Sequence, residues 1–160
     1  MELVCQIKPA QVTLVPDSPD QITSNHGWDT LKNQDFLTDI VSELKRNGIR
    51  ASVFVDPDPM MVELAAKAGA DRVELYTEPY ATNYLKSDPE TAVMPFVAAA
   101  RKARECGMGL NAGHDLSLVN LRFLKEQIPW LDEVSIGHAL VCDALYLGLE
   151  KTISEYKKCI

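Results

Sequence analysis

The sequence of 160 residues lacks the features that mark several classes of protein. Acidic residues outnumber basic ones by 23 to 16, and the net charge of −7 argues against a general nucleic-acid surface, which needs clustered Lys and Arg. No apolar run approaches the roughly 18 residues of a membrane-spanning helix. The opening residues, MELVCQIKPA, lack the basic and apolar regions of a secretory signal. We therefore expect a globular domain that binds neither nucleic acid nor a membrane.

Cysteine is scarce, and its spacing excludes several kinds of site. Four cysteines are scattered along the chain without a C-x-x-C pair or a metal-ligand spacing: Cys5, Cys106, Cys142 and Cys159. Unpaired thiols suit a reducing cytoplasm, where we place the protein, and we expect them to be buried or idle. A disulfide or a nucleophilic role stays open, because thiol reactivity depends on the local pKa.

The familiar short catalytic motifs are also absent. The chain has no H-E-x-x-H, no Walker loop, no G-x-G-x-x-G and no G-x-S-x-G. Its three histidines lie far apart in sequence, which is poor evidence for a metal site.

The sequence does contain an alternation of short apolar runs and longer amphipathic segments. We expect strands at residues 11–16, 51–55, 72–76, 108–112 and 133–136, apolar on both faces as in a buried parallel sheet. Helical spacing follows most runs, including a helix begun by Asp58, a long alanine-rich helix at 89–106, and one final stripe from Leu145 to Tyr156. The segments 17–29 and 77–88 are expected to be loops.

Five strand–helix repeats of about 30 residues predict an α/β fold with helices packed outside a parallel sheet. Two closures are possible: an open doubly wound sheet or part of a barrel. A complete eight-fold barrel typically needs about 250 residues, so this chain is too short for a whole one. In either closure, function concentrates just after the strand carboxyl ends.

Two of these strand ends carry the same Gly-His step. One gives Gly113, His114 and Asp115, and the other gives Gly137 and His138. Glycine lets a ligand approach the backbone, and amides at a helix start can hold a phosphate. In barrels, the loops after the last two strands often form a phosphate site. The alternative is a pair of tight turns in which the histidines bond only to local backbone groups.

Two further candidates are a carboxylate and a polar loop. Glu74 sits inside the apolar run at 72–76, so it should point into a barrel or cleft where burial perturbs its pKa. It could instead pair with a basic side chain in the core. The long loop at 17–29 holds Thr23, and loops of this length are often functional lids, although its composition favours a solvated loop. A cofactor-free enzyme acting on phosphorylated small molecules fits these features best.

Six motifs together resemble the pyridoxine 5'-phosphate synthase family, eight-fold α/β-barrel enzymes of vitamin B6 biosynthesis. They are VTLVPD at 12–17, ITSNHGWD at 22–29, VFVDPD at 53–58, VELYTEPYA at 73–81, LNAGHDL at 110–116 and IGHALV at 136–141. The resemblance runs over nearly the whole chain and corresponds to the C-terminal two thirds of the family. NAGH followed by IGHA is its most specific part.

The resemblance implies a reaction without a metal or an organic cofactor. The family condenses 1-deoxy-D-xylulose 5-phosphate with 3-amino-2-oxopropyl phosphate, giving pyridoxine 5'-phosphate, inorganic phosphate and water by general acid–base catalysis. Its members assemble as homo-oligomers, usually octamers. By motif, His114 matches the catalytic histidine and Glu74 matches the carboxylate that stabilises a transition state. Thr23 matches the lid residue that contacts the sugar phosphate.

The resemblance also assigns the phosphate-binding backbone to Asp115, Gly137 and His138. Some members have Gly where this chain has Asp115, and a backbone N–H contact survives that change. Residues 1–10 resemble the end of the family's third helix, so we expect a truncated chain of about five strand–helix units without the first three strands. Those strands supply further catalytic and substrate-holding groups in the family. We therefore expect little synthase activity from the chain alone, and a non-catalytic phosphate-binding fragment is the alternative.

Overall fold

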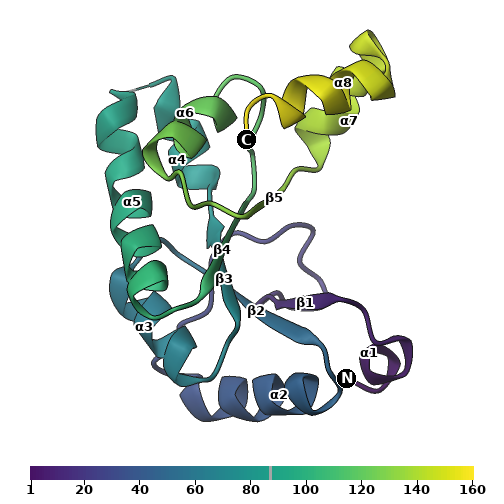
Figure 1. Ribbon diagram of the computed structural model, residues 1–160, viewed down its shortest axis with the longest axis vertical. Helices are drawn as coiled ribbons and strands as arrows, with labels where there is room; N and C mark the ends of the chain where they lie inside the picture. The colour runs from purple at the N-terminus through teal and green to yellow at the C-terminus, as the bar shows by residue number, and fades with distance from the viewer. Residues whose placement is uncertain (87) are drawn as a thin grey trace.

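The computed structural model describes residues 1–86 and 88–160, which form a curved parallel sheet with helices on its outer side (Figure 1). The strands lie side by side in chain order: β1 (Gln11–Leu14), β2 (Arg50–Val55), β3 (Arg72–Tyr76), β4 (Gly109–Gly113) and β5 (Glu133–Ser135). A doubly wound sheet reverses its strand order at a switch point, and this sheet does not. The fold is therefore a curled partial barrel, and the doubly wound alternative is wrong.

The helices divide into those that cover the sheet and those that project from its ends. The covering helices are α2 (Gln34–Arg46), α3 (Pro59–Lys67) and α5 (Pro89–Glu105), with α4 (Glu78–Tyr84) and α6 (Leu121–Gln127) nearby. Figure 1 shows α1 (Glu2–Ile7), α7 (His138–Leu147) and α8 (Leu149–Lys157) on the opposite, open side. Within 1–86 and 88–160, no helix is long and apolar enough to cross a membrane.

Side chains along each strand alternate between the helix layer and the interior of the partial barrel. In β2, Val53 and Val55 are buried in the apolar core beneath the helices. The positions between them are polar or aromatic and lie outside that core. Ser52 in β2, Glu74 in β3 and Asn111 in β4 are of this kind. This period of two is the geometry of a strand with two different faces. The expectation that the strands are apolar on both faces is therefore wrong for the inward face.

The segment after β3 also differs from expectation, because it forms α4 rather than a loop through residue 88. Pro79 occupies the first turn of this helix, where its missing N–H costs nothing. Tyr80 is fully buried, with its ring 5.5 Å from that of Tyr84 and 5.7 Å from that of Phe96. Tertiary packing of one aromatic side chain therefore stabilises a helix that the local sequence does not predict.

The C-terminal helix predicted as one stripe is two helices. Gly148 separates α7 from α8 with a φ of 82°, a backbone conformation that favours glycine and ends a helix. Leu145 and Leu149 are exposed, whereas Tyr156 is buried. The single buried stripe is therefore wrong.

The buried hydroxyl of Tyr80 offers a test of the packing around α4. It donates a hydrogen bond to the carbonyl of Asn120 at 2.7 Å. Replacing Tyr80 by Phe removes this hydrogen bond and leaves the carbonyl with the Leu124 N–H alone, so we expect the free energy of unfolding to fall by about 0.5–1.5 kcal/mol. Urea denaturation measures this change. The matched control is Tyr146→Phe, because Tyr146 is 90% exposed and its substitution should have almost no effect. Equal losses in the two variants would contradict the role given to the Tyr80 hydroxyl.

Candidate active site

A cavity of about 850 Å³ opens at the carboxyl ends of β3, β4 and β5. It brings together all six residues that the sequence singled out, which are Thr23, Glu74, His114, Asp115, Gly137 and His138. They come from the β1–α2 loop, from β3 and from the turns after β4 and β5. Parallel strands point their carboxyl ends the same way, so residues far apart in sequence meet here, as active-site residues do in barrel enzymes.

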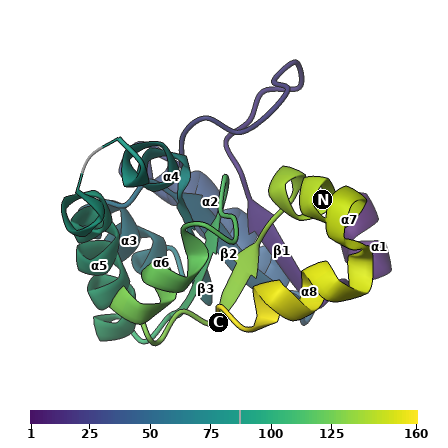
Figure 2. The same cartoon turned by 90° about the horizontal axis from the view of Figure 1, so that it is seen from above.

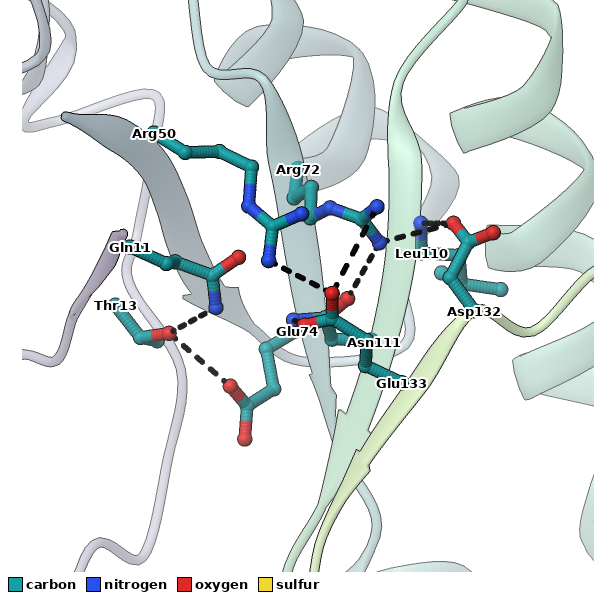
Figure 3. A network of polar contacts seen from close by, with 9 residues as sticks. All are labelled: Gln11, Thr13, Arg50, Arg72, Glu74, Leu110, Asn111, Asp132 and Glu133. Carbon is teal, nitrogen blue, oxygen red and sulfur yellow. Dashed lines mark hydrogen bonds and ion pairs between the residues drawn. The ribbon is translucent and has the colours of Figure 1, made fainter. Parts of the chain in front are cut away.

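Glu74 reaches the cavity from the middle of β3 and is only 7% exposed. Thr13 on β1 donates its hydroxyl proton to Oε2 of Glu74 at 3.2 Å (Figure 3). Burial raises the pKa of the Glu74 carboxyl above its ordinary value, although Ser135, Thr13 and the charge of His114 act in the opposite direction. Desolvation therefore dominates at this carboxyl, and the group holds its proton more readily than an exposed glutamate does.

The glycine at the end of β4 makes room for this carboxylate. A Cβ atom at Gly113 would lie 2.3 Å from Oε1 of Glu74, a separation that forces one of the two groups to move. The β3–β4 register places Gly113 opposite Tyr76, two residues beyond Glu74 on the same inward face. Gly113 therefore lets the buried carboxylate lie directly against the neighbouring strand.

Two arginines at the amino ends of the strands form ion pairs with carboxylates other than Glu74 (Figure 3). Arg50 forms an ion pair with Glu133 at 2.7 Å, which links β2 to β5 across the interior. Arg72 donates to Oδ1 of Asn111 at 2.9 Å and pairs with Asp132 at 3.0 Å. Among the residues that the structure describes, neither arginine pairs with Glu74. The alternative in which Glu74 is held by a basic core side chain therefore does not apply.

His114 lies on a strained turn between β4 and α6. Its φ is 89° and that of Asp115 is 57°, a left-handed conformation that side chains other than glycine rarely adopt. Such a residue costs on the order of 1–3 kcal/mol, and strain of this kind gathers at functional sites. The imidazole packs against the rings of Tyr76 and Phe54, with centroids 5.2 and 5.6 Å away. The strained turn thus carries an imidazole with aromatic walls into the cavity.

The β1–α2 loop reaches the cavity from outside the barrel, and Figure 2 shows it projecting from the other elements. Its far end is anchored on β2, where Gly27 N–H donates to Oδ1 of Asp56 at 3.1 Å and Trp28 N–H donates to the carbonyl of Phe54. A Cβ at Gly27 would lie 2.2 Å from the Asp56 nitrogen, so glycine is required for this approach. Thr23 lines the cavity from the part of the loop that precedes this anchor.

Sequence reasoning missed the aromatic walls and Ser135. Tyr76 follows Glu74 by two residues on β3, so the strand period alone places it on the same inward face. Ser135 ends β5 and also lines the cavity. Over residues 1–86 and 88–160, no group of three His, Cys, Asp or Glu side chains is placed to hold a metal ion.

The fold and the cavity define the class of the protein: a partial (β/α) barrel with a polar site at its strand carboxyl ends. Comparison with known proteins narrows this class. The chain belongs to the family described as pyridoxal phosphate biosynthesis protein PdxJ, which it matches over residues 1–160.

Curated relatives agree with this assignment, and a solved structure has a similar fold. Proteins named pyridoxine 5'-phosphate synthase from Bacteroides fragilis (strain YCH46) and Bacteroides thetaiotaomicron are 68% and 67% identical to the chain over 160 residues. The matches cover all of this chain and 67% of each relative. A chain of the crystal structure of the Amycolatopsis orientalis BexX/CysO complex has a TM-score of 0.58 and 14% identity, covering 98% of this chain and 61% of that chain. This likeness concerns the fold alone.

The raised pKa of Glu74 predicts how stability depends on pH. The folded protein binds a proton at Glu74 more readily than the unfolded chain does, so this group lowers the free energy of unfolding as pH rises above the ordinary carboxyl pKa. Glu74→Gln removes that titration. We expect the stability of the variant relative to wild type to increase between pH 4 and pH 8, as measured by urea denaturation at both values.

The control for this titration is Glu126→Gln, at an exposed position of α6. Its stability relative to wild type should stay nearly constant between the two pH values. If Glu74→Gln behaves in the same way, burial does not govern the ionisation of Glu74.

Proposed function

We propose that this chain supplies the Glu74 and His114 site of a pyridoxine 5'-phosphate synthase. The reaction condenses 1-deoxy-D-xylulose 5-phosphate with 3-amino-2-oxopropyl phosphate and releases inorganic phosphate and water. One observation carries the proposal: the cavity gathers, from four separate segments, the six residues that match the family's motifs. The names of the relatives from Bacteroides support the same activity.

Two groups in the cavity suit the proton transfers of this reaction. The buried Glu74 carboxyl, whose pKa burial raises, holds its proton more readily than an exposed glutamate and can stabilise charge that develops on a substrate oxygen. The His114 imidazole can accept and return protons during ring closure and elimination, because histidine gains and loses a proton with little cost near neutrality. Thr23 contacts the sugar phosphate from the β1–α2 loop, and residues 17–29 act as the lid.

The turns after β4 and β5 suit a substrate phosphate. Gly137 precedes the first turn of α7, where an α-helix gives the N–H groups of His138 and the next residues no intrahelical acceptor and presents the positive end of its dipole. A Cβ at Gly137 would meet no atom within 4 Å, so the approach to this backbone is open. We assign Asp115 a backbone N–H contact, with its carboxylate turned away because it would repel the phosphate.

We also propose that the five strands are the last five of an eight-stranded barrel. The relatives extend beyond the matched region, which is 67% of their length. Three further strands would lie between β1 and β5, on the side that Figure 1 shows without covering helices of the α2–α6 group. Closure there would complete the wall around the cavity and supply the substrate-holding groups that the family draws from those strands.

The direct test is a chimera in which this chain replaces the matched two thirds of the Bacteroides fragilis synthase. We expect it to form pyridoxine 5'-phosphate from the two substrates at a rate within tenfold of the parent enzyme. A folded chimera that binds 1-deoxy-D-xylulose 5-phosphate without forming product would overturn the proposal and favour a non-catalytic phosphate-binding fragment.

Within the chimera, His114→Ala should lower turnover by about 10²–10⁴-fold, the usual contribution of a general acid–base group. The free energy of unfolding should fall by only about 0.5–1.5 kcal/mol, because alanine loses the ring contacts with Tyr76 and Phe54, and the variant should stay folded. Steady-state kinetics measures the first effect and urea denaturation the second.

The matched control is Arg122→Ala, at an exposed position of α6, which should leave turnover unchanged. Wild-type turnover in the His114→Ala chimera would make His114 a structural turn residue.

A further inference from the structure

The strained turn at His114 and Asp115 needs support from its surroundings. Two consecutive residues other than glycine have positive φ, at 89° and 57°. Strain of this size persists only where neighbouring groups over-determine the backbone. The carbonyl oxygens of the turn show which groups these are.

Thr77 holds the first half of the turn. It follows β3 directly and is fully buried. Its backbone N–H donates to the carbonyl of Gly113 at 2.8 Å, and its hydroxyl lies 2.6 Å from that same oxygen. The hydroxyl is also within hydrogen-bond distance of the carbonyl of His114. One side chain thus meets the two consecutive carbonyls that lead into the strained residues.

Asn120 holds the second half. Its side chain is 5% exposed, and Nδ2 donates to the carbonyl of Asp115 at 3.2 Å. Its Oδ1 accepts the backbone N–H of Ser117 at 2.9 Å, which closes the turn before α6. The carbonyl of Asn120 is itself fixed by the buried hydroxyl of Tyr80. Support for the turn therefore extends into the core beneath α4.

We propose that Thr77 is a positioning residue that fixes the backbone of His114 and Asp115, with Asn120 holding the other end of the same turn. This inference rests on the proposed function of the cavity. Thr77 is buried behind the cavity and is not one of its lining residues. It acts by tying the end of β3, which carries Glu74, to the end of β4, which carries His114. The separation of the two acid–base groups then depends on its hydroxyl.

Two substitutions at Thr77 distinguish the positioning role from a role in packing alone. Thr77→Val keeps the shape of the side chain but removes the hydroxyl proton that lies within reach of the Gly113 and His114 carbonyls. Thr77→Ser keeps the hydroxyl and loses one methyl group. A purely packing role predicts that Val is the milder change, whereas a positioning role predicts that Ser is.

Thr152 provides a matched control. It is also fully buried, on α8, and its hydroxyl has no hydrogen-bond partner in the part of the chain that the structure describes. Thr152→Val should therefore leave both the turn and turnover unchanged.

The experiment has two readouts for each variant. Crystal structures of the full chain give φ at His114 and Asp115, and steady-state kinetics of the chimera gives kcat and KM. We expect Thr77→Val to move at least one of the two residues out of the positive φ region. We expect its kcat to fall about 10- to 100-fold, the scale of a small misplacement of a catalytic group. Thr77→Ser should remain within threefold of wild type in kcat, with both φ values positive.

The inference is overturned if Thr77→Val keeps both positive φ angles and a kcat within threefold of wild type. If Thr77→Val does not fold, Asn120→Asp decides, because it keeps the acceptor for Ser117 and loses the donor to Asp115. A loss of kcat with near-wild-type unfolding then supports the role, and wild-type kcat overturns it. If the wild-type chimera itself has no turnover, the proposed function fails, and the φ angles alone judge the positioning role.

Discussion

The alternation of side chains along the parallel strands determines where the chemistry of this molecule lies. The register that buries Val73 and Leu75 beneath the helices also turns Glu74 into the interior of the curled sheet. A slip of one residue would exchange these faces and place the carboxylate in the apolar layer, so the register is strongly determined. Desolvation of Glu74, and hence its raised pKa, follows from the same hydrophobic burial that holds the helices against the sheet.

The two ends of the strands use charge differently. At the amino ends, Arg50 and Arg72 are neutralised by Glu133 and Asp132, which ties β2 and β3 to the region of β5. At the carboxyl ends, the cavity contains a carboxyl, imidazoles and helix-start amides, and the strain of the turn at His114 is stored there. Barrel enzymes divide their strands in this way, with stability at one end and chemistry at the other. Among the described residues, the lining of the cavity accordingly contains carboxyl groups and imidazoles but no arginine.

Much of this arrangement could be predicted from the sequence, because local signals and the tertiary structure agree. Asp58 caps α3 by accepting the N–H of Met60 at 2.7 Å, as its position before Pro59 predicts. The five strands fall where the apolar runs place them. Parallel strands align their carboxyl ends, so the turns at His114 and Gly137 line one cavity there, where function was expected, and Glu74 points into that cavity as its place in an apolar run predicts. Their catalytic roles remain predictions.

The remaining features depend on information that a linear pattern does not carry. The helix α4 forms because Tyr80 finds a buried site between segments distant in sequence. The break at Gly148 and the positive φ of His114 are backbone conformations. A histidine does not by itself predict a positive φ at position 114. The polar inward face was missed because Asn111 bonds to Arg72 and Glu133 across the interior, and such contacts between strands are not visible in a local pattern. The residues of the site can therefore be predicted from the sequence, whereas the contacts that orient their side chains cannot.

We propose that the cavity, as this chain assembles it, recognises a phosphorylated sugar. A thermal melt of the full chain, with and without 1-deoxy-D-xylulose 5-phosphate, measures this binding. A ligand that binds only the folded state must raise the midpoint, and the rise must grow with ligand concentration. We expect a cooperative transition that shifts upward with the sugar phosphate. A broad transition, or a cooperative one that the ligand leaves in place, would show that this chain does not form the phosphate site.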